Sequence, residues 1–219
     1  MDLLETLLKG KIMMVPLMVC SVLALAVFLD RFMAFYRNSK VDVRALRSQL
    51  MRLLREHRVK DAALLCANTP GPISAVLLSG LQSYMKLEKR TPENTRITVG
   101  QAMEDFSNQS IGAVDKRLWI LAMIAAAAPL LGMTGTVTGM IKSFESLAQT
   151  AGVDAGKVGI GIAEALITTA AGLIIALGAV IPYSVFISMA DKIELDIDEA
   201  STAMLDLLVT EVDSEKADA

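Results

Sequence analysis

This chain of 219 residues is poor in the residues that build catalytic and metal sites, with one histidine, two cysteines and 5% aromatic residues. Cys20 lies in an apolar stretch and Cys66 in a charged one, which predicts two buried free thiols and no disulfide framework. His57 stands among charged residues, and we expect it to be a solvated helix residue. Because no ligand cluster surrounds it, the sequence predicts no metal and no cofactor.

Other absences exclude whole classes of function. The formal net charge is −3, so no global basic field attracts nucleic acid. No Gly-x-Ser-x-Gly motif occurs, and the apolar stretches contain neither a Ser–His pair nor paired aspartates. An intramembrane protease needs one of these arrangements, so the sequence predicts that the protein is not an enzyme.

Charge is missing altogether from three long runs, Ile12–Leu29, Leu118–Ile141 and Ala165–Ala190, in a chain that is 53% apolar. Each run is long enough to cross a bilayer as a helix. Asp30 and Arg31 follow the first run directly, without a cleavage site, which indicates an uncleaved span. The fold class predicted is an all-α membrane protein with three transmembrane helices.

Basic residues set the orientation, because 15 of the 21 lie between residues 30 and 117. The positive-inside rule places this segment in the cytoplasm. The predicted organisation is an outer segment 1–11, transmembrane helices 12–36, 118–141 and 160–189, a cytoplasmic helical region 37–117, an outer loop 142–159, and a cytoplasmic C-terminal helix and tail 190–219.

The cytoplasmic segments have helical patterns of their own. Leucines recur at helical spacing after Val43, the stretch 68–72 is a strong break, and a second helix is expected over Ile73–Lys89. Thr91 and Pro92 form an N-cap and a first helical position. We expect the helix that starts there to run unbroken into the second span, and the third span to continue past Met189. Two spans would then extend into a cytoplasmic helical bundle, in which a basic segment packs against an acidic C-terminal extension.

Small residues follow one side of the second span on a helical wheel, and the stripe contains a Gly-x-x-x-Gly motif. Such stripes let helices approach closely in lipid. In the third span the bulky residues form one face, and Glu164, Thr168 and most glycines and alanines share the other. The candidate packing and pore-lining residues are Pro129, Gly132, Gly135, Gly139, Gly161 and Gly172.

Glu164 is the candidate functional residue, since a carboxylate in or beside a membrane span is costly. Thr168 lies one turn further on the same side, and Thr169 lies on the flank. Two plainer interpretations stand beside this one. In the first, Glu164 is an interfacial residue near the outer surface of the membrane. In the second, the threonine hydroxyls only donate to backbone carbonyls of the preceding turn.

Two motifs carry a resemblance to a known family. APLLGMTGTVTGMIKSF (residues 128–144) and GIAEALITTAAG (residues 161–172) resemble the ExbB/TolQ/MotA proton-channel family, and are most similar to ExbB and TolQ. Residues 61–81 are loosely similar as well. Thr138 stands where many of those sequences have Trp, and Thr168 where many have Ala, so the subtype stays open. Three spans argue against MotA proper, which has four.

The resemblance implies an ExbB-like oligomeric channel in the bacterial inner membrane, with a periplasmic N-terminus and a cytoplasmic C-terminus. It implies a pentamer around an ExbD- or TolR-like single-span partner with an intramembrane aspartate, and a TonB- or TolA-like protein as a further partner. Proton motive force would drive outer-membrane transport or an envelope process. By position, Glu164 matches the family's glutamate, and Thr136 and Thr169 match its pore-facing threonines. The alternative is a passive membrane helical scaffold or adaptor without ion flow.

Overall fold

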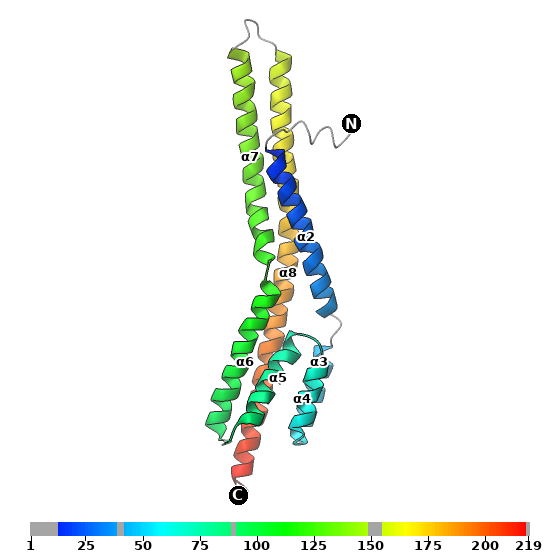
Figure 1. Ribbon diagram of the computed structural model, residues 1–219, viewed down its shortest axis with the longest axis vertical. Helices are drawn as coiled ribbons and strands as arrows, with labels where there is room; N and C mark the ends of the chain where they lie inside the picture. Colours follow the sequence, from blue (N-terminus) through cyan, green and yellow to red (C-terminus); the bar gives the residue numbers. More distant parts are fainter. Residues whose placement is uncertain (1–12, 39–41, 89–90, 149–154, 218–219) are drawn as a thin grey trace. The chain divides into compact units, whose positions relative to one another are not determined.

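The computed structural model describes residues 13–38, 42–88, 91–148 and 155–217, and within those ranges it contains helices and no strand (Figure 1). The predicted outer segment 1–11 lies outside the described residues. The helices in chain order are α2 (Met14–Asn38), α3 (Val43–Arg55), α4 (Val59–Asn68), α5 (Pro72–Lys86), α6 (Pro92–Asp115), α7 (Leu118–Ala148) and α8 (Ala155–Ala217).

Local sequence signals explain where the polar helices begin. The Asp42 carboxylate accepts hydrogen bonds from the backbone N–H groups of Arg44 and Ala45 and so caps α3. The predicted Thr91 cap of α6 is confirmed, because its hydroxyl oxygen accepts from the N–H of Asn94. The break predicted at 68–72 is confirmed by the end of α4 at Asn68 and the start of α5 at Pro72.

His57 is expected to be a solvated helix residue. Its side chain is exposed, as predicted, but the prediction that it lies in a helix is wrong. Helix α3 ends at Arg55, and His57 has a left-handed backbone with φ 58°. The His57 N–H donates to the Leu54 carbonyl at 2.8 Å, and the Arg58 N–H donates to the Leu53 carbonyl at 2.9 Å. These two bonds form a Schellman cap, which usually takes glycine at the left-handed position. With histidine there, the sequence gives no sign of the turn.

The expectation of one unbroken helix from Pro92 into the second span is also wrong. Helix α6 ends at Asp115 and α7 begins at Leu118, because Lys116 leaves the helical region at ψ 126° and Arg117 adopts φ 78°. Neither residue is a glycine or a proline, so the break has no sequence signal. The third span does continue past Met189, since α8 runs without interruption to Ala217.

The chain divides into two compact units, which we describe separately. The apolar unit comprises residues 1–32 and 117–186, and the polar unit comprises residues 33–116 and 187–219. In the polar unit α3, α4, α5 and α6 enclose a core together with the C-terminal part of α8. A side chain at Gly80 of α5 would meet the side chains of Met103 and Met204, so these methionines pack directly over this glycine.

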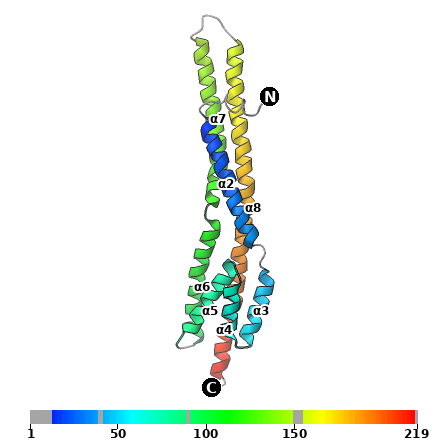
Figure 2. The same cartoon turned by 45° about the vertical axis from the view of Figure 1, so that its right-hand side comes forward.

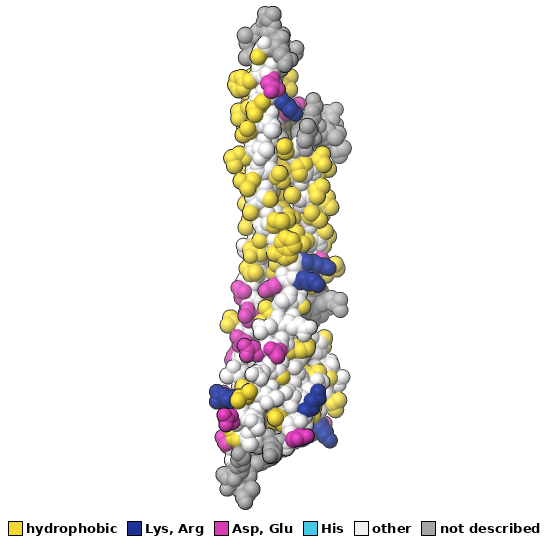
Figure 3. Space-filling model, turned by 60° about the vertical axis from the view of Figure 1, so that its left-hand side comes forward, with side chains coloured by type: hydrophobic (Ala, Val, Ile, Leu, Met, Phe, Trp, Pro, Cys, Tyr) yellow, Lys and Arg dark blue, Asp and Glu magenta, His cyan; other side chains and the backbone are white. Residues whose placement is uncertain are grey.

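Among the residues that the structure describes, three helices are long and apolar enough to cross a membrane, over Met14–Tyr36, Leu118–Glu145 and within Val158–Asp213. Large apolar side chains lie exposed on them, including the bulky face predicted for the third span. Figure 3 shows hydrophobic side chains covering much of the visible face of the apolar unit. Exposed apolar surface of this extent suits contact with lipid. The bulky face of the third span consists of Leu166, Leu173, Ile174, Leu177 and Ile181.

The two cysteines are free thiols with different surroundings. Cys66 is buried in the polar core, as predicted, and burial raises its pKa to about 11. The thiol therefore stays protonated near neutral pH and acts as a small apolar side chain. Cys20 is only half-buried in α2, so the prediction of burial holds for one cysteine of the two.

Replacing His57 tests the cap at the end of α3. His57→Gly should stabilise the polar unit by about 1 kcal/mol relative to His57→Ala, since glycine alone adopts a positive φ without steric cost. The measurement is denaturant unfolding of the detergent-solubilised chain, followed by circular dichroism. Equal midpoints for the two variants would contradict the left-handed conformation at residue 57.

Candidate functional site

Helices α7 and α8 lie side by side in the apolar unit, as Figure 1 and Figure 2 agree. Their backbones come into contact where Gly172 of α8 meets Ala128 and Gly132 of α7. A Cβ atom added at Gly172 would lie 2.5 Å from the Ala128 carbonyl oxygen and 3.1 Å from the Gly132 Cα. No rotamer change can relieve a clash with backbone atoms, so only glycine fits at residue 172.

The contact between α7 and α8 continues through the glycines of the small-residue stripe of α7. A Cβ at Gly135 would lie 2.5 Å from the Thr168 Cγ2, and one at Gly139 would lie 2.8 Å from the Ala165 Cβ. Further along, a Cβ at Gly161 would meet the Ser143 hydroxyl. We call this row of contacts the glycine seam; on the α7 side it consists of Ala128, Gly132, Gly135, Gly139 and Ser143, and on the α8 side of Gly161, Ala165, Thr168, Thr169 and Gly172.

A side-chain hydrogen bond links the two helices across the seam. The Thr169 hydroxyl donates to the Gly132 carbonyl oxygen at 2.9 Å. A carbonyl oxygen in a helix accepts one hydrogen bond from the backbone N–H four residues later. This bond uses only one of its two lone pairs, so the Gly132 oxygen can accept a second bond. Thr169 thus joins α8 to α7 where the glycines bring the backbones together. The helical wheel places this residue on the flank of the third span.

The other candidate threonines donate within their own helices. The Thr168 hydroxyl is 2% exposed and donates to the Glu164 backbone carbonyl at 3.0 Å, not to its carboxylate. The Thr136 hydroxyl donates to the Met133 carbonyl at 2.7 Å, and its side chain is half-buried. In all three threonines the hydroxyl proton is therefore committed to a carbonyl, and the oxygen is left as an acceptor.

Glu164 lies one turn before Thr168, and its side chain is half-buried. Among the residues that the structure describes, its carboxylate forms no hydrogen bond and no ion pair. Pro129 lies inside α7, one residue after Ala128. The structure thus brings Thr168, Thr169 and the candidate glycines into one seam, whereas no described hydrogen bond links Thr136 or the Glu164 carboxylate to it.

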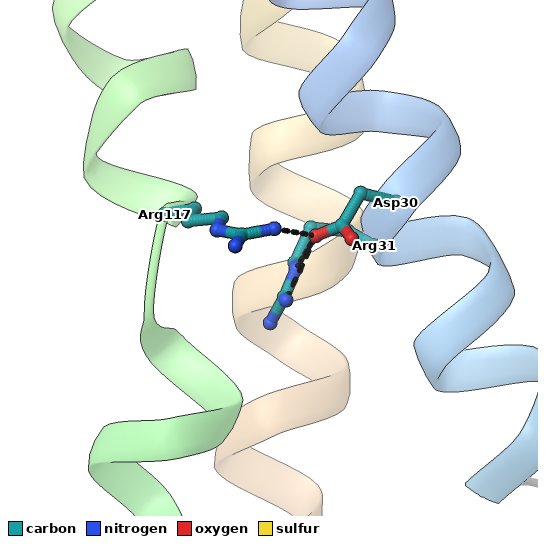
Figure 4. Close-up of polar contacts among 3 residues, drawn as sticks. All are labelled: Asp30, Arg31 and Arg117. Carbon is teal, nitrogen blue, oxygen red and sulfur yellow. Dashed lines mark hydrogen bonds and ion pairs between the residues drawn. The ribbon is translucent and has the colours of Figure 1, made fainter.

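Sequence reasoning missed two polar features of the apolar unit. Ser143 is 5% exposed and donates to the Gly139 carbonyl at 3.0 Å, and its approach to Gly161 makes it part of the seam. Asp30 of α2 accepts hydrogen bonds from Arg31 and from Arg117, each at 2.9 Å, as Figure 4 shows. The position of Asp30 and Arg117 at the ends of charge-free runs was the available signal for this second feature.

The apolar unit thus defines a membrane protein in which α7 and α8 pack through glycine, with Glu164 directly before Ala165 of the packed face. Residues 68–199 match the model of the MotA/TolQ/ExbB proton channel family. The chain belongs to this family. The family is one of channel and transport components and not a class of enzymes.

Named relatives agree with this assignment. The chain is 33% identical to biopolymer transport protein ExbB-like 1 of Synechocystis sp., over 96% of this chain and 80% of that protein. It is 28% identical to the biopolymer transport protein ExbB of Pseudomonas putida, over 93% of this chain and 61% of that protein. It is 32% identical to the Tol-Pal system protein TolQ of Haemophilus influenzae, over 57% of this chain and 58% of that protein.

Gly172 and Gly178 form a matched pair for testing the seam. Gly172→Ala should lower the thermal midpoint, because the added Cβ would lie 2.5 Å from a backbone oxygen and the helices must separate. Gly178→Ala should be neutral or stabilising by up to about 1 kcal/mol, since nothing lies within 4 Å and alanine favours helix. Thermal unfolding in detergent measures both. An unchanged midpoint in Gly172→Ala would exclude the close approach of α7 and α8.

Proposed function

We propose that this protein is a subunit of a proton-driven motor complex. A homo-oligomeric ring, a pentamer by family resemblance, would surround an ExbD- or TolR-like single-span partner with an intramembrane aspartate. Proton flow would be converted into work on a TonB- or TolA-like protein and so drive outer-membrane transport or an envelope process. The observation that supports this best is the glycine seam, with hydroxyl oxygens and a lone carboxylate beside it, in a chain of the proton-channel family.

The membrane arrangement is part of the proposal. The protein would lie in the bacterial inner membrane with a periplasmic N-terminus and a cytoplasmic C-terminus, because the segment rich in lysine and arginine belongs inside. In this arrangement residues 12–36, 118–141 and 160–189 span the membrane, 37–117 and 190–219 form a cytoplasmic helical bundle, and 1–11 and 142–159 face the periplasm.

The hydroxyl geometry suggests how a proton would be handled. A charged carboxylate cannot cross an apolar wall, but the neutral acid can. The Thr136 and Thr169 hydroxyls already donate to carbonyls, so each presents an oxygen that accepts. A protonated partner carboxyl can donate to such an oxygen, whereas an ionised one has nothing to donate. These oxygens would therefore favour the protonated partner, and Thr168 would hold the turn that carries Glu164.

Glu164 would supply the negative charge that attracts the proton to this part of the path. Residues 165–190 contain no other charged group, so the field of its carboxylate is not cancelled within the third span. The energy available is about 2.3 kcal/mol for each charge and each 100 mV of membrane potential.

The first test replaces Glu164. In a complex purified with a single-span partner and reconstituted into vesicles, Glu164→Ala should reduce proton flux under an imposed potential by at least ~10-fold, equal to about 1.4 kcal/mol of barrier. The mass of the complex should not change. Leu166→Ala is the control, because Leu166 lies two residues away on the exposed bulky face and should leave the flux unaltered.

The same assay tests the threonines. Thr136→Val should reduce proton flux, because valine has the same branched side chain and lacks the acceptor oxygen. Thr134 is an exposed neighbour that also donates to a carbonyl, at 2.8 Å, and Thr134→Val should have no effect. A passive scaffold predicts that Glu164→Ala and Thr136→Val both behave like the parent. That result, in an intact complex, would favour the scaffold.

A further inference from the structure

A groove of about 360 Å³ with a mixed polar and apolar lining lies between α6 and α8 within the polar unit. Its charged lining residues are all acidic, namely Glu104 of α6 and Glu194 and Asp198 of α8. Figure 3 shows acidic side chains gathered on one face of this unit. No lysine or arginine lines the groove, so nothing in its wall neutralises these carboxylates.

Two hydroxyls in the same groove lack partners. Ser107 is only 8% exposed, and no hydrogen bond to its side chain occurs among the described residues. The Ser201 Oγ is buried and likewise forms no hydrogen bond there. Leaving a buried hydroxyl unpaired costs free energy, which a bound donor would recover. Each hydroxyl can accept a hydrogen bond from a bound donor, and the three carboxylates of the same groove favour a ligand with positive charge.

A guanidinium or ammonium group meets both requirements. Arginine carries five N–H donors and a permanent charge, and carboxylates with hydroxyls are its usual acceptors. A bare metal ion fits less well, because the described residues contain no group of three acidic, cysteine or histidine side chains placed to hold one. The groove thus suits a basic side chain from another polypeptide.

The same chain offers such a side chain on the opposite flank of α8. Helix α3 is joined to α8 there by an ion pair of Arg47 and Glu199 at 2.6 Å. Figures 1 and 2 both place α6 on one side of α8 and α3 on the other. Arg44 lies on the side of α3 away from the buried Leu46, and its guanidinium forms no ion pair within the described ranges. One flank therefore carries unpaired acceptors and the other an unpaired cation.

We propose that the groove binds Arg44 of a second copy of this chain. Two different, complementary patches make a head-to-tail contact, which closes into a ring when the rotation fits. Rotation about a ring axis parallel to α8 keeps every residue at its own height. Arg47 lies within side-chain reach of Glu199, and Arg44 lies about one turn before Arg47, which brings it near the turns of α8 that carry Glu194 and Asp198. The inference rests on the proposed ring assembly and specifies one of its contacts.

Disulfide trapping tests this contact in the full-length chain. In a Cys20→Ser, Cys66→Ala background, the pair Arg44→Cys and Glu194→Cys should give a ladder of cross-linked species up to the full ring on oxidation. Each single-cysteine variant should give no species larger than a dimer. Arg55→Cys with Glu194→Cys is the matched control, because Arg55 lies eleven residues further along the same helix, beyond the height of Glu194. It should give no ladder.

A charge exchange provides a second measurement. Arg44→Glu and Glu194→Arg should each lower the temperature at which the detergent-solubilised ring dissociates, and the double variant should regain most of that loss. The mass of the parent is determined first. A parent ring without the ladder and without rescue overturns the Arg44 contact and leaves the proposed function standing, whereas a parent that remains monomeric overturns both.

Discussion

The contact of two helix backbones at Gly172 and Ala128 is the constraint on which the apolar unit depends. In lipid no hydrophobic force draws one apolar helix toward another, so association depends on packing and on hydrogen bonds. The glycines allow both. They bring α7 close enough to α8 for the Thr169 hydroxyl to reach the Gly132 carbonyl. With a larger residue at Gly132 or Gly172, the bond from Thr169 would lengthen or break. The two helices would then lose their close contact and this hydrogen bond together.

This arrangement gives the threonines a defined polarity. A hydroxyl in water can donate or accept, but one whose proton is bound to a carbonyl offers only its oxygen. Thr136, Thr168 and Thr169 are all in this state. Back-bonding to a carbonyl and a role in proton handling are therefore compatible interpretations of the same side chain. The carbonyl bond decides which kind of group the threonine can recognise.

Much of this could be predicted from the sequence, and the failures have physical causes. Charge-free runs predicted the three apolar helices, because length and composition act locally, whereas the small-residue stripe indicated close helix packing without saying which helix the second span meets. The turns at His57 and at Lys116–Arg117 could not be predicted, since residues that usually avoid positive φ occupy two of these positions. The Asp30–Arg117 pair joins residues far apart in the chain, and the bond from Thr169 depends on a helix spacing that one sequence does not reveal.

The closeness at Gly172 also affects how evolutionary variation in such chains should be interpreted. Any substitution there adds an atom against a backbone oxygen, so selection would retain glycine even in a protein that had lost ion transport but kept its fold. Invariance at this position reports geometry. Thr136 differs, because its side chain is half-buried and its hydroxyl donates within its own helix. An unchanging hydroxyl there would be stronger evidence of selection for chemistry than an unchanging glycine in the seam.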